Sequence, residues 1–465
     1  MQKPPSISIP ERLNQWIQES IMIKLLSIGI LVIILLIPTA WITNLIYERQ
    51  TRAARVTEEI AAKWSSAQTL TGPVLVIPYL SETVIDKGDA GKEVTQRLVS
   101  AYFLPTDLKV KGIVEPERRY RGIFEAVVYH STLSFSTTFT KPDWLALSID
   151  ENKVSWKDVH VIFGISDLRG ITDDLSIVVA GKPIETEPSN NVGVSVTPTP
   201  GPESGIRPAP GSSQGVIAHM NWSGPTDFQG DIAIDLKLKG SQRLDFIPTG
   251  KTTTVELSGP WPTPSFDGAF LPSSREVSDE GFSARWRVLH FNRPLPQQWV
   301  GHQEISGADF GVKLLVPVDQ YQKSVRTAKY AVMIILLTFM ALFLVEITQK
   351  VRIHPFQYIL IGAALIIYYS LLLSLSEHFG YNTAYIVASL ATVGLITLYS
   401  STFFPHRALV VLLFILLLIF YGFIYVIILH EDLSLLIGSV GLFLIIAALM
   451  YFSRNVRYYK TESLE

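Results

Sequence analysis

The sequence predicts a membrane protein in which six transmembrane helices form an α-helical bundle. A large β-rich domain is inserted between helices one and two. We expect an antiparallel sandwich, with one lobe or two as the alternatives. Two observations carry this prediction. Residues 330–452 contain only seven charged side chains in 123 positions, and a further apolar stretch lies near the start of the chain. Between them, long helical periodicity gives way to period-two alternation.

Six apolar stretches are candidates to cross a hydrocarbon core of ~30 Å, which takes about 20 helical residues. They are Leu25–Ile46, Tyr330–Val345, Tyr358–Leu375, Ala384–Tyr399, Leu409–Leu429 and Leu435–Phe452. The first is longer than the apolar region of a secretory signal and lacks a small-residue cleavage site, so we interpret it as an uncleaved anchor. Aromatic residues near the span ends are expected to be interfacial anchors: Trp41, Tyr330, Tyr358, Tyr381, Tyr385, Tyr399 and Tyr451.

Basic residues in the short loops predict the orientation, because Lys and Arg are enriched on the cytoplasmic side. The loops after spans two, four and six contain Lys350, Arg352, Arg407, Arg454, Arg457 and Lys460, whereas residues 376–383 and 430–434 contain neither Lys nor Arg. We therefore expect residues 1–24 and 453–465 to be cytoplasmic. Residues 47–329 then lie outside the cytoplasm, and 330–452 form a five-helix transmembrane domain.

The inserted domain shows the alternation of half-buried strands. Residues 231–239 place four apolar side chains on one face and mostly charged ones on the other. A helical pattern continues from the first span to about Trp64, as a short stalk. Residues 188–215 are rich in Pro, Gly and Ser and predict a loop or linker. Phe103-Leu104-Pro105 recurs as Phe270-Leu271-Pro272, which raises the alternatives of an internal duplication or a coincidence between two strand–turn segments.

Composition excludes several classes of protein. With 39 basic and 41 acidic residues the chain lacks the basic face of a nucleic-acid binder, so we expect no nucleic-acid partner. It contains no cysteine, which rules out disulfides, Cys-ligated zinc and thiolate catalysis. The motifs of phosphate-binding loops, zinc proteases and serine hydrolases are missing too. We therefore expect no cofactor and no enzymatic activity.

The candidate functional residues lie mostly at the predicted outer membrane face. Ser376-Glu377-His378 follows span three and His430-Glu431-Asp432 follows span five, so the two loops would emerge on one side. Their carboxylates and imidazoles would suit a divalent metal or a proton relay. Short polar loops that end helices in water explain them more simply, and we expect no metal.

Three further charged residues flank the second span. Glu346 is the one acid inside an apolar span, and we expect it near the cytoplasmic boundary. An ion pair with Lys350, one helical turn further on, would be sufficient to accommodate its charge. Arg326 and Lys329, just outside the span, would anchor the helix, or contact lipid phosphates or the outer carboxylates.

Long segments in both halves resemble the CreD family of inner-membrane proteins. They include Trp261-Pro-x-Pro-Ser-Phe-x-Gly-x-Phe-Leu-Pro272, Pro317-x-Asp319-Gln-Tyr321, Arg326-x-x-Lys329-Tyr-Ala331, Phe343-x-x-Glu346, His354-Pro-x-Gln-Tyr358 and Leu373-x-Leu-Ser-Glu377-His378. The resemblance implies a Gram-negative inner-membrane protein linked to cell-envelope integrity and stress response, with the β-rich domain in the periplasm. It adds Asp319, Tyr321 and His354 to the candidate residues, and it implies no defined reaction.

Three functional hypotheses follow. The favoured one is a non-enzymatic binding, sensing or scaffold role of the β-rich domain, with the lipid bilayer and envelope proteins as partners. The alternative is a transporter that carries a lipid or small molecule through the six helices. The least supported is an outward-facing membrane enzyme built on Glu377, His378, His430 and Glu431. The sequence itself does not name a substrate or a partner.

Overall fold

The computed structural model describes residues 21–86, 92–192, 194–197, 214–301, 303–314, 319–349, 351, 353–430 and 433–453. The chain divides into two compact units. One comprises Met1–Ala54 with Val318–Glu465 and is helical in its described part. The other, Arg55–Pro317, is built mainly of β-strands. The prediction of several apolar helices and a large β-rich domain is thereby confirmed.

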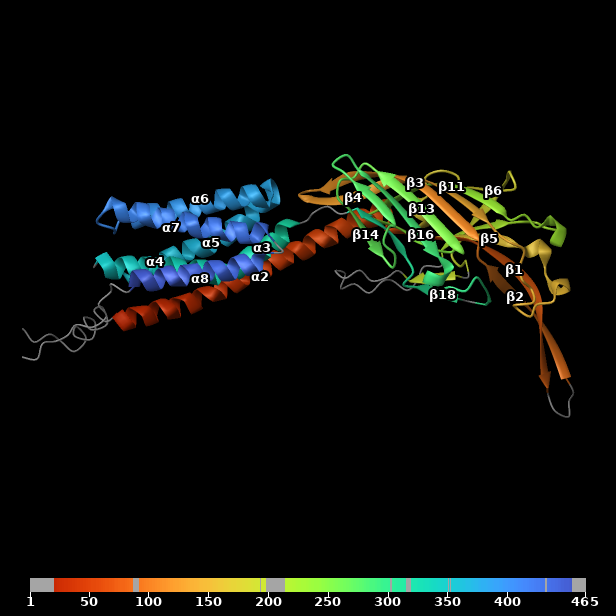
Figure 1. The fold of residues 1–465 in the computed structure, drawn as a ribbon, viewed down its shortest axis with the longest axis horizontal. Coiled ribbons are helices and arrows are strands. Elements are labelled where there is room, and N and C mark those ends of the chain that lie inside the picture. Colours follow the sequence, from red (N-terminus) through yellow and green to blue (C-terminus); the bar gives the residue numbers. More distant parts are fainter. Residues whose placement is uncertain are drawn as a thin grey trace, which may run out of the picture. The chain divides into compact units, whose positions relative to one another are not determined.

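Helices occur at all six predicted spans (Figure 1). They are α2 (Ile21–Trp64), α3 (Asp319–Lys329) with α4 (Ala331–Gln349), α5 (Pro355–Phe379), α6 (Tyr381–Ser400), α7 (Arg407–Leu429) and α8 (Ser434–Ser453). In the described residues, α2, α5, α6 and α7 are long and apolar enough to cross a membrane. The pair α3–α4 qualifies as a fifth span with a 44° bend, and the apolar part of α8 runs only from Ser434 to Ala447.

The helices pack around one apolar core, to which α2, α3, α4, α5, α6 and α7 contribute buried side chains such as Phe339, Leu365 and Leu417. Many apolar side chains also point outward, including Ile33 and Trp41 of α2, as expected of surfaces that face lipid. Three of the tyrosines that were predicted to be anchors at the membrane interface do not lie on the outer surface. Tyr358, Tyr381 and Tyr385 are buried in the bundle, where their rings pack against other helices.

The second unit is a sandwich of two large sheets, together with a two-stranded sheet, in the described part of the chain (Figure 1). The nine-stranded sheet contains β1 (Gln68–Asp86), β2 (Lys92–Phe103), β5 (His160–Ile165), β8 (Thr186–Ser189), β10 (Gly215–His219), β12 (Arg243–Ile247), β14 (Pro264–Gly268), β17 (Gln298–Val300) and β19 (Phe310–Leu314). The eight-stranded sheet contains β3 (Asp107–Arg121), β4 (Phe124–Thr138), β6 (Ser176–Val179), β7 (Lys182–Ile184), β11 (Asp231–Ser241), β13 (Thr252–Gly259), β15 (Ser274–Val277) and β16 (Phe282–Leu289). The short strands β9 (Val194–Thr197) and β18 (Gln303–Ser306) pair with each other.

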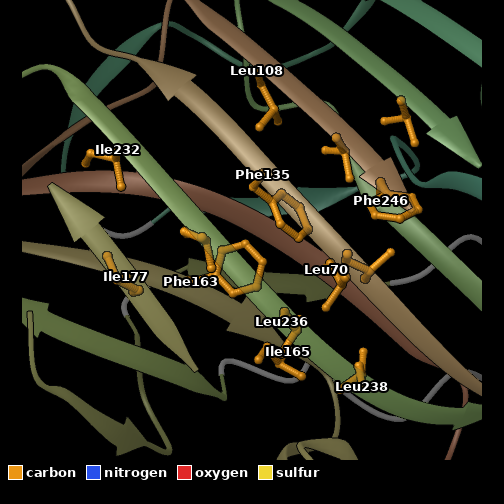
Figure 2. Packing of buried hydrophobic residues seen from close by; sticks show 14 of the residues in the cluster. Leu70, Leu108, Phe135, Phe163, Ile165, Ile177, Ile232, Leu236, Leu238 and Phe246 are labelled. Carbon is orange, nitrogen blue, oxygen red and sulfur yellow. The ribbon is translucent and has the colours of Figure 1, made fainter. Parts of the chain in front are cut away.

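Alternating side chains of the two sheets meet in a single core (Figure 2). The ring of Phe135 on β4 packs edge-on against that of Phe163 on β5, with centroids 4.9 Å apart, and so joins one sheet to the other. The alternation predicted for residues 231–239 is observed along β11, whose apolar side chains at Ile232, Ile234, Leu236 and Leu238 are all buried. Because both sheets share this core, the hypothesis of two separate lobes is wrong.

The two large sheets of the sandwich have one topological feature in common. Each large sheet has a parallel pair at its middle, β1 with β12 and β3 with β13, and each pair is flanked by antiparallel neighbours. The sheets are therefore mixed and not purely antiparallel. Phe103-Leu104-Pro105-Thr106 leads into β3, and Phe246-Ile247-Pro248-Thr249 leads into its counterpart β13. The predicted repeat at Phe270–Pro272 leads instead into the edge strand β15, which is not equivalent to β3.

The described ends of the Pro/Gly/Ser-rich segment belong to strands. Residues 188–189 finish β8, residues 194–197 form β9, and Gly215 begins β10. The rest of the predicted linker, residues 198–213 with the single position 193, lies outside the described residues.

The helical pattern expected to continue beyond the first span is present, because α2 runs unbroken to Trp64. Its last turns belong to the same unit as the sandwich and are attached to it by polar contacts. Arg169 donates to the carbonyl of Ala62 at 3.1 Å, and the guanidinium of Arg119 lies 4.9 Å from the centre of the Trp64 ring. These contacts fix the end of the helix where the first strand begins.

Candidate functional site

The most constrained candidate is Glu346, near the end of α4. Its side chain is 4% exposed, and its carboxylate accepts from three donors: the Lys24 ammonium at 2.6 Å, the Tyr358 hydroxyl at 3.0 Å and the backbone N–H of Ile353 at 3.3 Å. A buried carboxylate needs such donors to offset its lost hydration. The expected partner, Lys350, lies outside the described residues. Lys24, at the start of α2, is a partner that the sequence analysis does not predict.

A cavity of about 610 Å³ opens beside this carboxylate. Its walls are mostly apolar side chains of α2, and its polar end contains Lys24, Glu346, His354 and Tyr358. The full lining is Ile23, Lys24, Ser27, Ile28, Ile30, Leu31, Ile34, Glu346, Ile353, His354, Pro355, Tyr358 and Ile359. This size and this mixture are typical of sites that bind a small molecule.

His354 is the N-cap of α5. Its backbone N–H donates to the side chain of Gln357 at 2.8 Å, while its Nδ1 accepts from the N–H of Phe356 at 3.2 Å. This capping box satisfies two groups at the helix start. It also fixes the imidazole at the edge of the cavity, so this predicted residue joins Glu346 in one site.

A second cluster surrounds Glu377, in the last turn of α5. The Tyr321 hydroxyl of α3 donates to Glu377 at 3.2 Å, and Arg49 of α2 lies 4.0 Å from the same carboxylate oxygen. Tyr321 is buried and Glu377 nearly so. The structure therefore brings two predicted residues together and adds Arg49 as a partner that was not predicted.

The remaining predicted residues differ in their burial. Arg326 is half-buried on α3, Lys329 is exposed at the end of α3, and His378 and His430 are exposed. Only the backbone of Asp319 is described, and Glu431 and Asp432 lie outside the described residues. Among the described residues, no group of three or more His, Asp or Glu is arranged to hold a metal ion.

The two clusters are separated by similar distances along α2 and α5. Lys24 and Arg49 are 25 residues apart on α2, and His354 and Glu377 are 23 residues apart along α5. At 1.5 Å per residue these spacings are about 38 Å and about 35 Å. Both exceed a hydrocarbon core of ~30 Å by a few ångströms. Each cluster thus lies where a spanning helix would leave the apolar layer.

Between the clusters, α5, α6 and α7 bury a group of tyrosines that sequence reasoning missed. Tyr385 donates to the carbonyl of Tyr421 at 2.7 Å, and the Tyr368 ring lies edge-on 5.0 Å from the Tyr421 ring. The hydroxyls of Tyr369 and Tyr421 have no hydrogen-bond partner in the described part of the chain. The sequence could have indicated this group, because Tyr381 with Tyr385 and Tyr421 with Tyr425 have the i,i+4 spacing that places two side chains on one face of a helix.

One group of buried charges in the sandwich forms ion pairs. Arg243 contacts Asp245 at 2.5 Å and Asp309 at 2.9 Å, and all three side chains are largely buried. Burial raises the pKa of Asp245 to about 7, against the opposing effect of Arg243. Arg243 and Asp245 lie on β12, and Asp309 immediately precedes its antiparallel neighbour β19.

Comparison with known proteins identifies the family. The family model described as "Inner membrane protein CreD" matches residues 20–459. The chain belongs to the CreD family. It is 31% identical over 440 residues to the inner membrane protein CreD of Escherichia coli (strain K12), covering 94% of this chain and 93% of that relative. The resemblance noted in the sequence is thereby confirmed, and with it the assignment to an inner-membrane protein.

One of the solved structures that match this CreD-family chain belongs to a peptidase. It is an M1 zinc metallopeptidase variant from Deinococcus radiodurans, bound to a Tyr-Ser-Ala substrate. The match covers 45% of this chain and 42% of that chain, with 9% identity and a TM-score of 0.20. A likeness this low carries no argument about fold or function.

Proposed function

We propose that this CreD-family protein supports cell-envelope integrity through binding by its β sandwich in the periplasm, without an enzymatic reaction of its own. In this proposal six helices cross the inner membrane and both termini are cytoplasmic. The third span is α5, and α3 and α4 together form the second.

The spacing of the two polar clusters supports this topology. Lys24 and Glu346 belong to opposite ends of their helices, the start of α2 and the end of α4, as antiparallel spans require. The basic loop residues occur on the Glu346 side, which agrees with a cytoplasmic location for this cluster. The Glu377 cluster then lies at the periplasmic face.

We infer the binding role from the hairpin of β1 and β2, which extends beyond the rest of the sheets (Figure 1). From Ser81 to Asp86, β1 pairs only with β2 in the described part of the chain. Leu80 and Leu98 face each other across the hairpin and are 41% and 57% exposed, with Val94 at 55% on the same face. Two-stranded hairpins are marginally stable alone, and exposed strand edges readily accept another strand. A partner polypeptide in an extended conformation fits this surface.

A complementation assay tests the binding role. In cells that lack the chromosomal gene and are scored for envelope sensitivity, Leu98→Asp on the hairpin should abolish rescue. Leu145→Asp is the control, because Leu145 is 92% exposed elsewhere on the sandwich and should tolerate a charge. Equal rescue by both variants would contradict the role of the hairpin.

The same assay tests the cluster around Glu377. The double variant Glu377→Gln with His378→Ala should retain rescue. Loss of rescue at an unchanged protein level would favour an enzyme or a proton-coupled carrier.

The absence of cysteine makes the topology directly testable. Thr132→Cys places one thiol on an exposed position of β4, and Ser401→Cys places one in the loop after α6. With the outer membrane permeabilised, a membrane-impermeant maleimide should label the first variant in intact cells and the second only after lysis. The reverse pattern would overturn the proposed orientation.

The cavity beside Glu346 favours one alternative function, a carrier of a lipid or small molecule. A carrier needs a ligand site within its helices, and this cavity is built from three of them. Transport of a labelled ligand distinguishes the two functions. A carrier would transfer the ligand across the membrane of proteoliposomes, whereas a scaffold would not.

A further inference from the structure

We propose that the cavity between α2, the end of α4 and the start of α5 binds one glycerophospholipid of the surrounding membrane. Its acyl chain would lie along the isoleucines of α2, and its phosphate would lie at Lys24 and His354. This inference goes beyond the proposed function, because such a site would serve a scaffold and a carrier alike.

The walls of the cavity suit an acyl chain. Ile23, Ile28, Ile30, Leu31 and Ile34 of α2 supply most of the apolar surface, and its volume of about 610 Å³ is within the range of small-molecule sites. Ile30 and Ile34 are 50% and 53% exposed, so the apolar wall continues onto the surface that faces lipid. A chain can therefore enter from the bilayer without first crossing water.

The opposite end of the cavity supplies donors for a phosphate. The Lys24 ammonium has three N–H donors, and Glu346 is its one described partner; the side chain remains 30% exposed. Because Nδ1 of His354 accepts from Phe356, the ring proton of the neutral imidazole is on Nε2, which is then a donor. The 25-residue helix α5 begins here as well, and its N-terminal dipole favours an anion.

The same arrangement disfavours a free anion. Glu346 compensates the charge of Lys24 at 2.6 Å, so the polar end alone offers little net attraction to inorganic phosphate. A ligand that also fills the apolar part gains from burial of its chain. Charge and shape together therefore indicate an amphiphile, and a phospholipid is the amphiphile that the bilayer provides.

Native mass spectrometry of the purified full chain in dodecyl maltoside tests this site, with palmitoyl-oleoyl phosphatidylglycerol as the probe. Ser27→Phe and Ile359→Phe fill the cavity from α2 and from α5, without touching the ion pair. Ile33→Phe and Leu360→Phe are the matched controls, because both residues are exposed on the same helices and neither lines the cavity. Two filling variants keep the test decisive if one fails to fold.

We expect each folded filling variant to bind the lipid about tenfold more weakly than the wild type, and the controls to bind like the wild type. Wild-type affinity in a folded filling variant would overturn the proposal. For the headgroup, His354→Asn retains a capping residue but lacks Nε2–H, and it should weaken binding about threefold. Diacylglycerol binding as tightly as the phospholipid would refute the phosphate site, and saturable binding of inorganic phosphate alone would refute the lipid as the ligand.

Discussion

The ammonium of Lys24 lies 2.6 Å from a carboxylate oxygen of Glu346, although 322 positions separate the two residues. The pair joins the first turn of α2 to the last turns of α4. Tyr358 donates to the other carboxylate oxygen, so α5 is held at the same point. A single buried acid thus connects three helices.

The losses of stability caused by removing the two members of this pair should not be additive. Lys24→Met leaves a buried carboxylate without its cation and should lower the free energy of unfolding by about 2 kcal/mol, given that Lys24 is partly exposed. Lys24→Met with Glu346→Gln should lose less than the sum of the single variants. Unfolding in mixed micelles of increasing SDS content, followed by circular dichroism, measures the helical unit. Additive losses would show that the pair contributes nothing.

The contact of α5 with α2 and α4 depends on a glycine. A Cβ at Gly362 would lie 2.5 Å from Cδ1 of Leu35 and 3.1 Å from Cζ of Phe339, both buried. Gly362→Val should therefore destabilise the helical unit by about 2 kcal/mol through overpacking. Gly394→Val is the control, because no atom lies within 4 Å of a Cβ there. In the same SDS titration this control should be neutral or stabilising, since Val is a better helix former than Gly. Equal losses in both variants would contradict the packing argument.

Local patterns were sufficient to predict the apolar helices and the buried face of one strand. The apolar runs predicted α2 and α4–α8, and the alternation of residues 231–239 predicted the buried face of β11. The parallel pairs β1–β12 and β3–β13 were not predictable, because they join strands more than 140 residues apart. The sequence could not decide between one lobe and two for the same reason, because one shared core forms only when these pairings assemble both sheets.

In the candidate sites too, contacts between residues far apart in the sequence could not be predicted from local patterns. Glu346 and Glu377 were identifiable as acids at the ends of apolar spans. Their partners Lys24, Tyr358, Tyr321 and Arg49 lie on other helices, and the order of packing around the bundle cannot be read from one helix. Tyr358 was predicted to face the membrane interface, because a tyrosine at a span end has the same local pattern whether it meets lipid or a buried carboxylate.

In the sandwich, Arg293 should be essential to the turns that precede β3 and β13. It is 6% exposed and donates to the carbonyls of Thr249, Gly250 and Leu295 and to the side chain of Gln297. Burial lowers its pKa to about 10, so it remains charged at neutral pH. Arg293→Met would leave these acceptors unsatisfied and should cost about 3 kcal/mol.

Denaturation of the full chain followed by tryptophan fluorescence measures this loss, because seven of the nine tryptophans lie between Arg55 and Pro317. Arg287→Met is the control, since Arg287 is exposed on β16. A loss in the control as large as that in Arg293→Met would mean that the buried hydrogen bonds of Arg293 are not the cause.

Acid should weaken the junction between α2 and the sandwich through Asp167. Hydrogen bonds from Arg169 lower the pKa of Asp167 to about 2, and the backbone N–H of Ser66 donates to the same carboxylate. Because the folded pKa is below the unfolded value of about 3.9, the stabilisation is complete above that value and is lost as the pH falls toward 2. The expected loss is about 1 kcal/mol, since the partly exposed Arg169 is screened by solvent. Asp167→Asn and Arg169→Gln should both flatten the fluorescence-monitored stability profile between pH 4 and 2 relative to wild type, and an undiminished slope in Arg169→Gln would exclude the guanidinium as its cause.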